Sequence, residues 1–189
     1  MDKVLTEEQG GSLLRLARRV IGGRLGIEAP DGPDEPDQTA EFATFVTLKI
    51  GGVLRGCIGN LKAEGSVTES VRRNAAHAAF NDHRFSPLTA EELEQVHIDI
   101  SVLSTPVTLE YSDGEDLLAR LRPGVDGVIL RLGTAGATFL PQVWEQLPAP
   151  ELFLGHLCRK AGLSEDAWRE SHPQIEIYQV QSFAEEREV

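Results

Sequence analysis

One thiol in this chain of 189 residues stands among glycines, a setting that points to chemistry. Cys57 lies within residues 54–59, Leu-Arg-Gly-Cys-Ile-Gly, which follow a run rich in β-branched residues. If a strand persists through this segment, Arg55 and Cys57 are two residues apart and project from the same face. A guanidinium so placed stabilises a thiolate and lowers the thiol pKa from about 8.5. We therefore predict a reactive cysteine, with Arg55 and Cys57 as the candidate catalytic residues.

The glycines of the same segment have two explanations. Backbone N–H groups from Gly56 to Gly59 can cradle an oxyanion, which makes both glycines candidates for substrate binding. Alternatively, Cys57 is a small packed residue and the glycines serve a β-bulge. The residue types alone leave both explanations open.

Three charged residues elsewhere are further candidates for binding a substrate. Asp82 and Arg84 are two residues apart in a polar turn, and an arginine can bind a carboxylate or phosphate through two hydrogen bonds. A local ion pair or a helix cap explains the same two residues. Glu145 can serve as a proton acceptor, although an exposed helical position is the favoured explanation for it.

The sequence supports neither a metal nor a nucleotide cofactor. Histidines occur at 77, 83 and 97, but no His-Glu-x-x-His or Cys-x-x-Cys pair fixes two ligands locally. Neither a Gly-x-Gly-x-x-Gly turn nor a phosphate-loop lysine is present. We expect no cofactor and no metal.

Composition narrows the possible partners and the compartment. A net charge of −12 and a pI near 4.8 disfavour binding to a phosphate backbone, so no nucleic-acid partner is expected. No window approaches about 18 uninterrupted apolar residues, and the start lacks the pattern of a signal peptide. We therefore expect a cytoplasmic protein without a membrane span. Cys158 recurs with leucines at helical spacing, which predicts a core position and a free thiol.

A hairpin is expected to position the thiol. Residues 42–50 and 53–58 are rich in β-branched and aromatic residues, and Gly51 and Gly52 between them supply the positive φ of a two-residue turn. Cys57 should therefore lie near the end of a sheet strand and not on a mobile loop.

Capping boxes predict where three helices begin, because a Ser or Thr is followed three residues later by Glu or Gln. The pairs are Thr6 with Gln9, Ser66 with Glu69, and Thr89 with Glu92. The first helix is expected to stop near residues 22–23 and the second at about Phe80.

The remaining pattern mixes hairpins with helices. The expected segments are an acidic, proline-rich loop at 28–38; strand pattern at 96–109, interrupted by Pro106; a helix at 115–121; strands at 127–132 and 137–140 around a turn at 133–136; helical pieces at 142–146 and 150–161; a strand at 175–180; and a charged tail at 184–189. Because strict alternation of strand and helix is absent, the sequence predicts an α+β fold with a mixed or antiparallel sheet.

The segment at 54–59 resembles the hallmark hexapeptide of the AMMECR family, whose prokaryotic members are called AmmeMemoRadiSam system protein A. Similar motifs follow in the family's order: Phe-Val-Thr-Leu at 45–48, Asp-His-Arg-Phe at 82–85, Ile-Ser-Val-Leu at 100–103, Leu-Pro-Gln-Val at 140–143 and Lys-Ala-Gly-Leu at 160–163. Together they cover most of residues 6–183, which the resemblance treats as a single domain. His83 is a departure, since the family commonly has proline there.

The resemblance implies a two-lobed α+β protein, with a larger sheet flanked by helices, a smaller second lobe, and the hexapeptide near a cleft between them. It also favours placing Asp82 and Arg84 in that cleft. The family brings no assigned reaction, but its prokaryotic name implies two partners: a Memo-like protein similar to extradiol dioxygenases, and a radical S-adenosylmethionine enzyme. Two functions stay open: a Cys-dependent enzyme acting on a small substrate, and a non-catalytic binding or scaffold subunit of that system.

Overall fold

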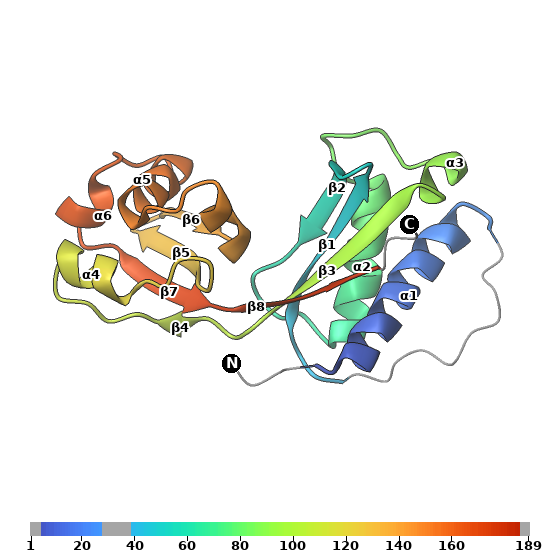
Figure 1. Ribbon diagram of the computed structural model, residues 1–189, viewed down its shortest axis with the longest axis horizontal. Helices are drawn as coiled ribbons and strands as arrows, with labels where there is room; N and C mark the ends of the chain where they lie inside the picture. Colours follow the sequence, from blue (N-terminus) through green and yellow to red (C-terminus); the bar gives the residue numbers. More distant parts are fainter. Residues whose placement is uncertain (1–4, 28–38, 186–189) are drawn as a thin grey trace. The chain divides into compact units, whose positions relative to one another are not determined.

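A computed structural model describes residues 5–27 and 39–185, which form two compact units (Figure 1). The first unit contains the chain up to Leu103 and again from Gln181, and the second contains Ser104–Val180. The acidic loop predicted at 28–38 lies outside the described residues. Within the described part of the chain, no helix has both the length and the apolar character of a membrane span.

The first unit is built on a four-stranded sheet in the order β2-β1-β3-β8. Its strands are β1 (Ala43–Ile50), β2 (Val53–Gly59), β3 (Val96–Leu103) and β8 (Val180–Ala184). β1 pairs antiparallel with both β2 and β3. Gly51 and Gly52 turn the β1–β2 hairpin with φ values of +58° and +83°, which confirms the predicted turn.

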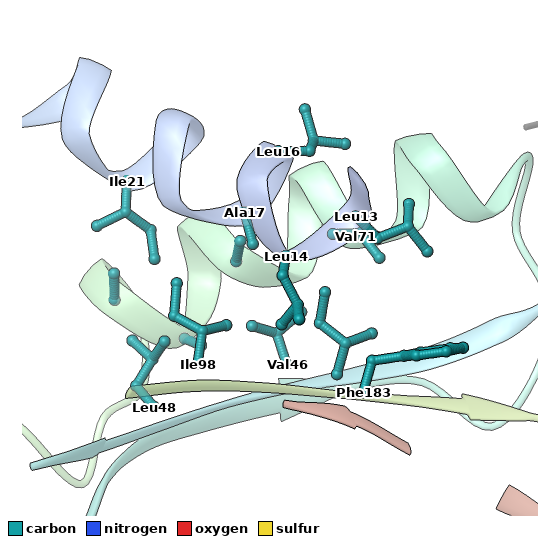
Figure 2. Close-up of a cluster of buried hydrophobic side chains, with 14 of the residues drawn as sticks. Leu13, Leu14, Leu16, Ala17, Ile21, Val46, Leu48, Val71, Ile98 and Phe183 are labelled. Carbon is teal, nitrogen blue, oxygen red and sulfur yellow. The ribbon is translucent and has the colours of Figure 1, made fainter. Parts of the chain in front are cut away.

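Helices cover one face of this sheet. α1 (Glu7–Arg24) and α2 (Val67–Phe80) pack on it, and the short α3 (Ala90–Leu93) precedes β3. Figure 2 shows Leu13, Ala17 and Ile21 of α1 among the buried side chains that meet Val46 and Ile98 of the sheet. Burial of this apolar cluster is what holds the helices on the sheet.

The three predicted capping boxes are confirmed, each with both reciprocal hydrogen bonds. The end of α1 at Arg24 agrees with the expected stop near residues 22–23. The helix continues through the buried Gly22 to Arg24 and stops before Gly26, whose φ of +74° is typical of the residue that follows a helix.

The chain returns to the first unit through a strand that the sequence did not predict. The apolar run near 175–180 divides into β7 (Gln174–Tyr178), which stays in the second unit, and β8. Glu185, expected in a charged tail, accepts hydrogen bonds from Arg18 Nε at 2.6 Å and from the backbone N–H of Ile98 at 2.9 Å. The last described residue is therefore part of the fold.

The second unit has its own sheet in the order β4-β7-β5-β6 and its own core. Its other elements are β4 (Val107–Thr108), α4 (Gly114–Arg120), β5 (Gly127–Leu132), β6 (Ala135–Phe139), a 3₁₀ helix η1 (Pro141–Glu145), α5 (Pro150–Lys160) and α6 (Ala167–Glu170). Leu132 pairs with Ala135, so the hairpin turn is two residues long and β6 begins earlier than predicted. The antiparallel pairings in both units, together with their helices, confirm the α+β class.

Candidate functional site

Cys57 lies in β2, an edge strand of the first sheet, which confirms that the thiol belongs to a strand. It stands opposite Thr47 of β1, and the Cys57 Sγ is 3.3 Å from the Thr47 Oγ1. The backbone N–H and C=O of Cys57 point away from β1, so the two residues form a non-hydrogen-bonded pair, whose side chains approach closely. The residue as a whole is half-buried.

Asp82 and Arg84 seal the open edge of β2 at Cys57. The Asp82 Oδ2 accepts a hydrogen bond from the Cys57 backbone N–H at 2.9 Å, and the Arg84 Nη2 donates to the Cys57 C=O at 3.2 Å. Two side chains thus take the place of a neighbouring strand and satisfy both backbone groups. The structure therefore brings these two predicted residues to Cys57.

The Asp82 carboxylate is buried, and both of its oxygens accept hydrogen bonds. Its side chain is 2% exposed, and besides Cys57 it binds Arg84 through the backbone N–H, Nε and Nη2 at 3.2, 2.9 and 2.7 Å. The Arg84 hydrogen bonds hold the pKa of Asp82 well below its usual range, despite burial. The same pair raises the pKa of Arg84, and negative charge on Cys57 adds to that rise. The Arg84 guanidinium therefore lies beside both the Asp82 carboxylate and the backbone of Cys57.

Arg55 is directed elsewhere, because β2 contains a β-bulge. Leu48 pairs with Gly56 and Lys49 with Leu54, which leaves Arg55 as the extra residue. The bulge breaks the simple alternation from which we expected Arg55 and Cys57 to share a face.

The Arg55 guanidinium instead binds α3 and the segment before it. Its Nε and Nη2 donate to the two carboxylate oxygens of Glu92 at 2.8 and 2.9 Å, and Nη2 also donates to the Ser86 C=O at 3.0 Å. These hydrogen bonds, with a further one from the Thr89 backbone, lower the pKa of Glu92 to about 2. The charge of Arg55 is thus matched by a carboxylate.

An aromatic ring connects the two ion pairs. The Cζ atoms of Arg55 and Arg84 lie 5.8 and 5.5 Å from the centre of the Phe85 ring. We call these residues the Cys57 cluster: Thr47, Arg55, Cys57, Asp82, Arg84, Phe85 and Glu92. Phe85 and Glu92 were not predicted as site residues, although the motif at 82–85 contains the first and a capping box contains the second.

Close packing explains both glycines of the hexapeptide. A Cβ on Gly56 would lie 2.2 Å from the Ala78 carbonyl oxygen of α2, and one on Gly59 would lie 2.3 Å from the Phe45 ring. The Cys57 N–H that was expected to join an oxyanion cradle is donated to Asp82. Substrate binding by Gly56 and Gly59 stays a prediction.

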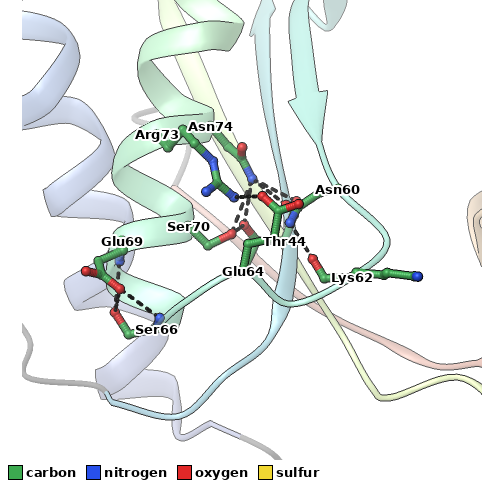
Figure 3. Close-up of polar contacts among 9 residues, drawn as sticks. All are labelled: Thr44, Asn60, Lys62, Glu64, Ser66, Glu69, Ser70, Arg73 and Asn74. Carbon is green, nitrogen blue, oxygen red and sulfur yellow. Dashed lines mark hydrogen bonds and ion pairs between the residues drawn. The ribbon is translucent and has the colours of Figure 1, made fainter.

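A buried polar network fixes α2 against the hairpin (Figure 3). The Asn74 Nδ2 donates to the Thr44 carbonyl and hydroxyl oxygens at 3.0 Å and to the Asn60 Oδ1 at 3.2 Å. The Thr44 and Ser70 hydroxyls are 2.8 Å apart. The network holds the helix that ends two residues before Asp82. No local sequence signal marks these contacts, which join segments 26 and 30 residues apart.

The other predicted residues are not members of this cluster. Glu145 is an exposed residue of η1 in the second unit, whereas the Cys57 cluster belongs entirely to the first, so its role there stays a prediction. His77 and His83 are exposed, and the His97 Nε2 lies 3.3 Å from Asp99. Among the described residues, no group of three His, Cys, Asp or Glu side chains is arranged to hold a metal ion.

The protein is of the α+β class, and in its first unit a cysteine-bearing edge strand is sealed by an aspartate and an arginine. Residues 14–183 match the model of the AMMECR1 family, and the chain belongs to this family.

Relatives match either nearly the whole chain or about 70% of it. A protein from Methanothermobacter thermautotrophicus is 34% identical over 191 residues, covering 96% of this chain and 97% of the relative. One from Thermofilum pendens is 39% identical over 137 residues, covering 70% of this chain and 62% of the relative. The crystal structure of an uncharacterised protein from Pyrococcus horikoshii matches with a TM-score of 0.84 and 32% identity, over 96% of this chain and 94% of that one. These comparisons establish the family and the fold without assigning a reaction.

Proposed function

We propose that this protein is a Cys57-dependent enzyme acting on a small substrate, with Cys57 as its nucleophile. One observation carries the proposal. Packing and ion-pair contacts explain why the hexapeptide has its two glycines and its arginine, but no contact explains why residue 57 carries a sulfur atom. Gly56 and Gly59 are required by close packing, and Arg55 is held by Glu92. The Cys57 Sγ contacts the Thr47 hydroxyl, a contact that a serine would make equally well.

The surroundings suit a nucleophilic thiolate. Arg84 supplies a nearby positive charge, and the Thr47 hydroxyl is placed to donate a hydrogen bond to the sulfur. In the proposed step the thiol proton leaves to solvent, and the sulfur electron pair forms a bond to an electrophilic carbon of the substrate. The bond from that carbon to its leaving group breaks, and the leaving group departs with the electron pair of that bond. Asp82 acts as a positioning residue because it holds Arg84. Arg55 is also a positioning residue, because it binds Glu92 and lies against the Phe85 ring that Arg84 contacts from its own position.

A second function is favoured by the same contacts. Because Asp82 and Arg84 satisfy the edge of β2, the hexapeptide also makes sense as a structural motif in a non-catalytic subunit. The family name then suggests binding to a Memo-like protein and a radical S-adenosylmethionine enzyme.

Selective alkylation of the folded protein separates the two functions. With iodoacetamide we expect Cys57 to be modified well before Cys158, whose side chain is fully buried and whose pKa burial raises. Mass spectrometry of the peptides measures both rates in one sample. Modification of Cys158 as fast as Cys57 would contradict the enzyme proposal, and an inert Cys57 with a partner complex that survives Cys57→Ser would favour the scaffold.

A further inference from the structure

We infer that the Cys57 site selects small electrophiles that carry a carboxylate or phosphate group, and that Arg84 binds this group. The inference rests on the proposed function, because it assumes that the Cys57 thiol reacts. It names the chemical class of the substrate and the residue that recognises it.

The first argument is the unequal exposure of the Asp82–Arg84 pair. The Arg84 side chain is 47% exposed, whereas that of Asp82 is 2% exposed. Both Asp82 oxygens accept hydrogen bonds from the backbone N–H of Cys57 or Arg84 and from the Arg84 guanidinium. A solute approaching this pair therefore meets a guanidinium and not a carboxylate, and guanidinium geometry matches planar oxyanions.

The second argument is position. The Arg84 Nη2 donates to the carbonyl oxygen of Cys57 itself, so the guanidinium lies beside the residue that carries the thiol. An anion bound to the open side of Arg84 would hold its attached carbon atoms near the sulfur. Such a placement raises the local concentration of the electrophile at the nucleophile.

Arg55 is not placed to bind an anion in the same way. Its side chain is 14% exposed and that of its partner Glu92 is 32% exposed, so at this pair the carboxylate is the more accessible group. An anion would meet repulsion from Glu92 before it reached Arg55. The two arginines that flank Phe85 therefore have different roles, and only Arg84 is expected to bind the substrate's anionic group.

Two alkylating reagents with the same reactive carbon and different charge test the inference. In both reactions the Cys57 sulfur attacks the methylene carbon, the S–C bond forms, iodide leaves with the electron pair of the C–I bond, and the thiol proton goes to solvent. Iodoacetate carries a carboxylate and iodoacetamide is neutral. The ratio of the two rates at Cys57, divided by the same ratio for free cysteine, isolates the effect of charge.

In dilute buffer we expect this normalised ratio to favour iodoacetate about fivefold. A factor of this size corresponds to the attraction between two opposite unit charges, here the guanidinium and the carboxylate, in contact in water. At about 1 M salt, where the screening length is about 3 Å, the preference should disappear. The salt comparison uses the unaltered protein and so does not depend on whether a variant folds.

Two matched variants assign the effect to Arg84. Arg84→Gln should bring the normalised ratio close to one. Arg122→Gln is the control, because Arg122 is 53% exposed and binds the fully buried Asp126 in the same manner, within the second unit. This control should retain the preference for iodoacetate.

The outcomes separate this inference from the proposed function. If neither reagent modifies Cys57 in the folded protein, the proposed function fails. If iodoacetamide modifies Cys57 but the normalised ratio is one in dilute buffer, the proposed function stands and the anion preference is overturned. A preference that survives Arg84→Gln, or is lost equally in Arg122→Gln, also overturns it. Protection of Cys57 by acetate or by inorganic phosphate shows which oxyanion the site prefers.

Discussion

Arg84, rather than Arg55, is the arginine that contacts Cys57, through a hydrogen bond from its Nη2 to the Cys57 carbonyl oxygen. The sequence spacing favoured Arg55 because two residues separate it from Cys57 in a strand. Arg55 is the extra residue of a β-bulge in β2, and its side chain binds Glu92, which is 37 positions away in the chain. Bulges and long-range ion pairs depend on tertiary packing, so residue spacing alone could not have predicted this arrangement.

The Arg55–Glu92 pair makes a prediction about acid stability. The pKa of Glu92 is lowered from 4.5 to about 2, chiefly by Arg55, so its contribution to folding is present above about pH 4.5 and is lost as the pH falls towards 2. Glu92→Gln, which resembles the protonated acid, should lower the free energy of unfolding at neutral pH and have a smaller effect at about pH 3. Urea unfolding at both pH values measures the difference, and a gap that does not change with pH would refute the assignment.

At the scale of elements, local signals predicted most of what surrounds the site. Capping boxes mark the starts of α1, α2 and α3 because the cap and its partner are three residues apart. The Gly51-Gly52 turn likewise depends only on backbone preference at two positions. The sequence did not predict β8 or the Thr44–Asn74 network, because both depend on contacts between distant segments.

The contact between β2 and α2 gives a prediction at this scale. Gly56→Ala would place a Cβ 2.2 Å from the Ala78 carbonyl oxygen, and the backbone must shift to make room. We expect a loss of about 1–3 kcal/mol in the free energy of unfolding, as for other overpacked sites.

Gly23→Ala is the matched control for this change. Gly23 lies in α1, and no atom lies within 4 Å of the position that the added methyl group would occupy, so alanine should be neutral or slightly stabilising there. Urea denaturation of both variants provides the comparison. Equal stability of Gly56→Ala and Gly23→Ala would show that β2 and α2 do not need this close approach.

On the scale of the whole molecule, the second unit is an insertion between β3 and β8. Its two ends are joined, since the Ser104 N–H donates to the Gln179 carbonyl and the Gln179 N–H donates to the Ser104 hydroxyl, both at 2.9 Å. The first unit keeps its own core and contains every member of the Cys57 cluster. The cluster should therefore form without the second unit.

Excision of residues 104–179, with a short glycine linker from Leu103 to Val180, tests this independence. We expect a folded protein with a cooperative urea transition and a Cys57 alkylation rate within about twofold of that of the full chain, because every member of the Cys57 cluster belongs to the first unit. A folded product whose Cys57 rate differs by an order of magnitude would show that the second unit contributes to the site.

The most direct test of the account is the rate at which iodoacetamide modifies Cys57 at neutral pH in the unaltered protein, in Arg84→Gln and in Arg55→Gln. Because the Arg84 guanidinium lies beside Cys57 and Arg55 is bound to Glu92, we predict that Arg84→Gln slows the reaction several-fold more than Arg55→Gln does. Circular dichroism should first show that all three proteins are folded. Equal rates in the three proteins, or a larger effect of Arg55→Gln, would contradict the claim that Arg84 supports a reactive Cys57.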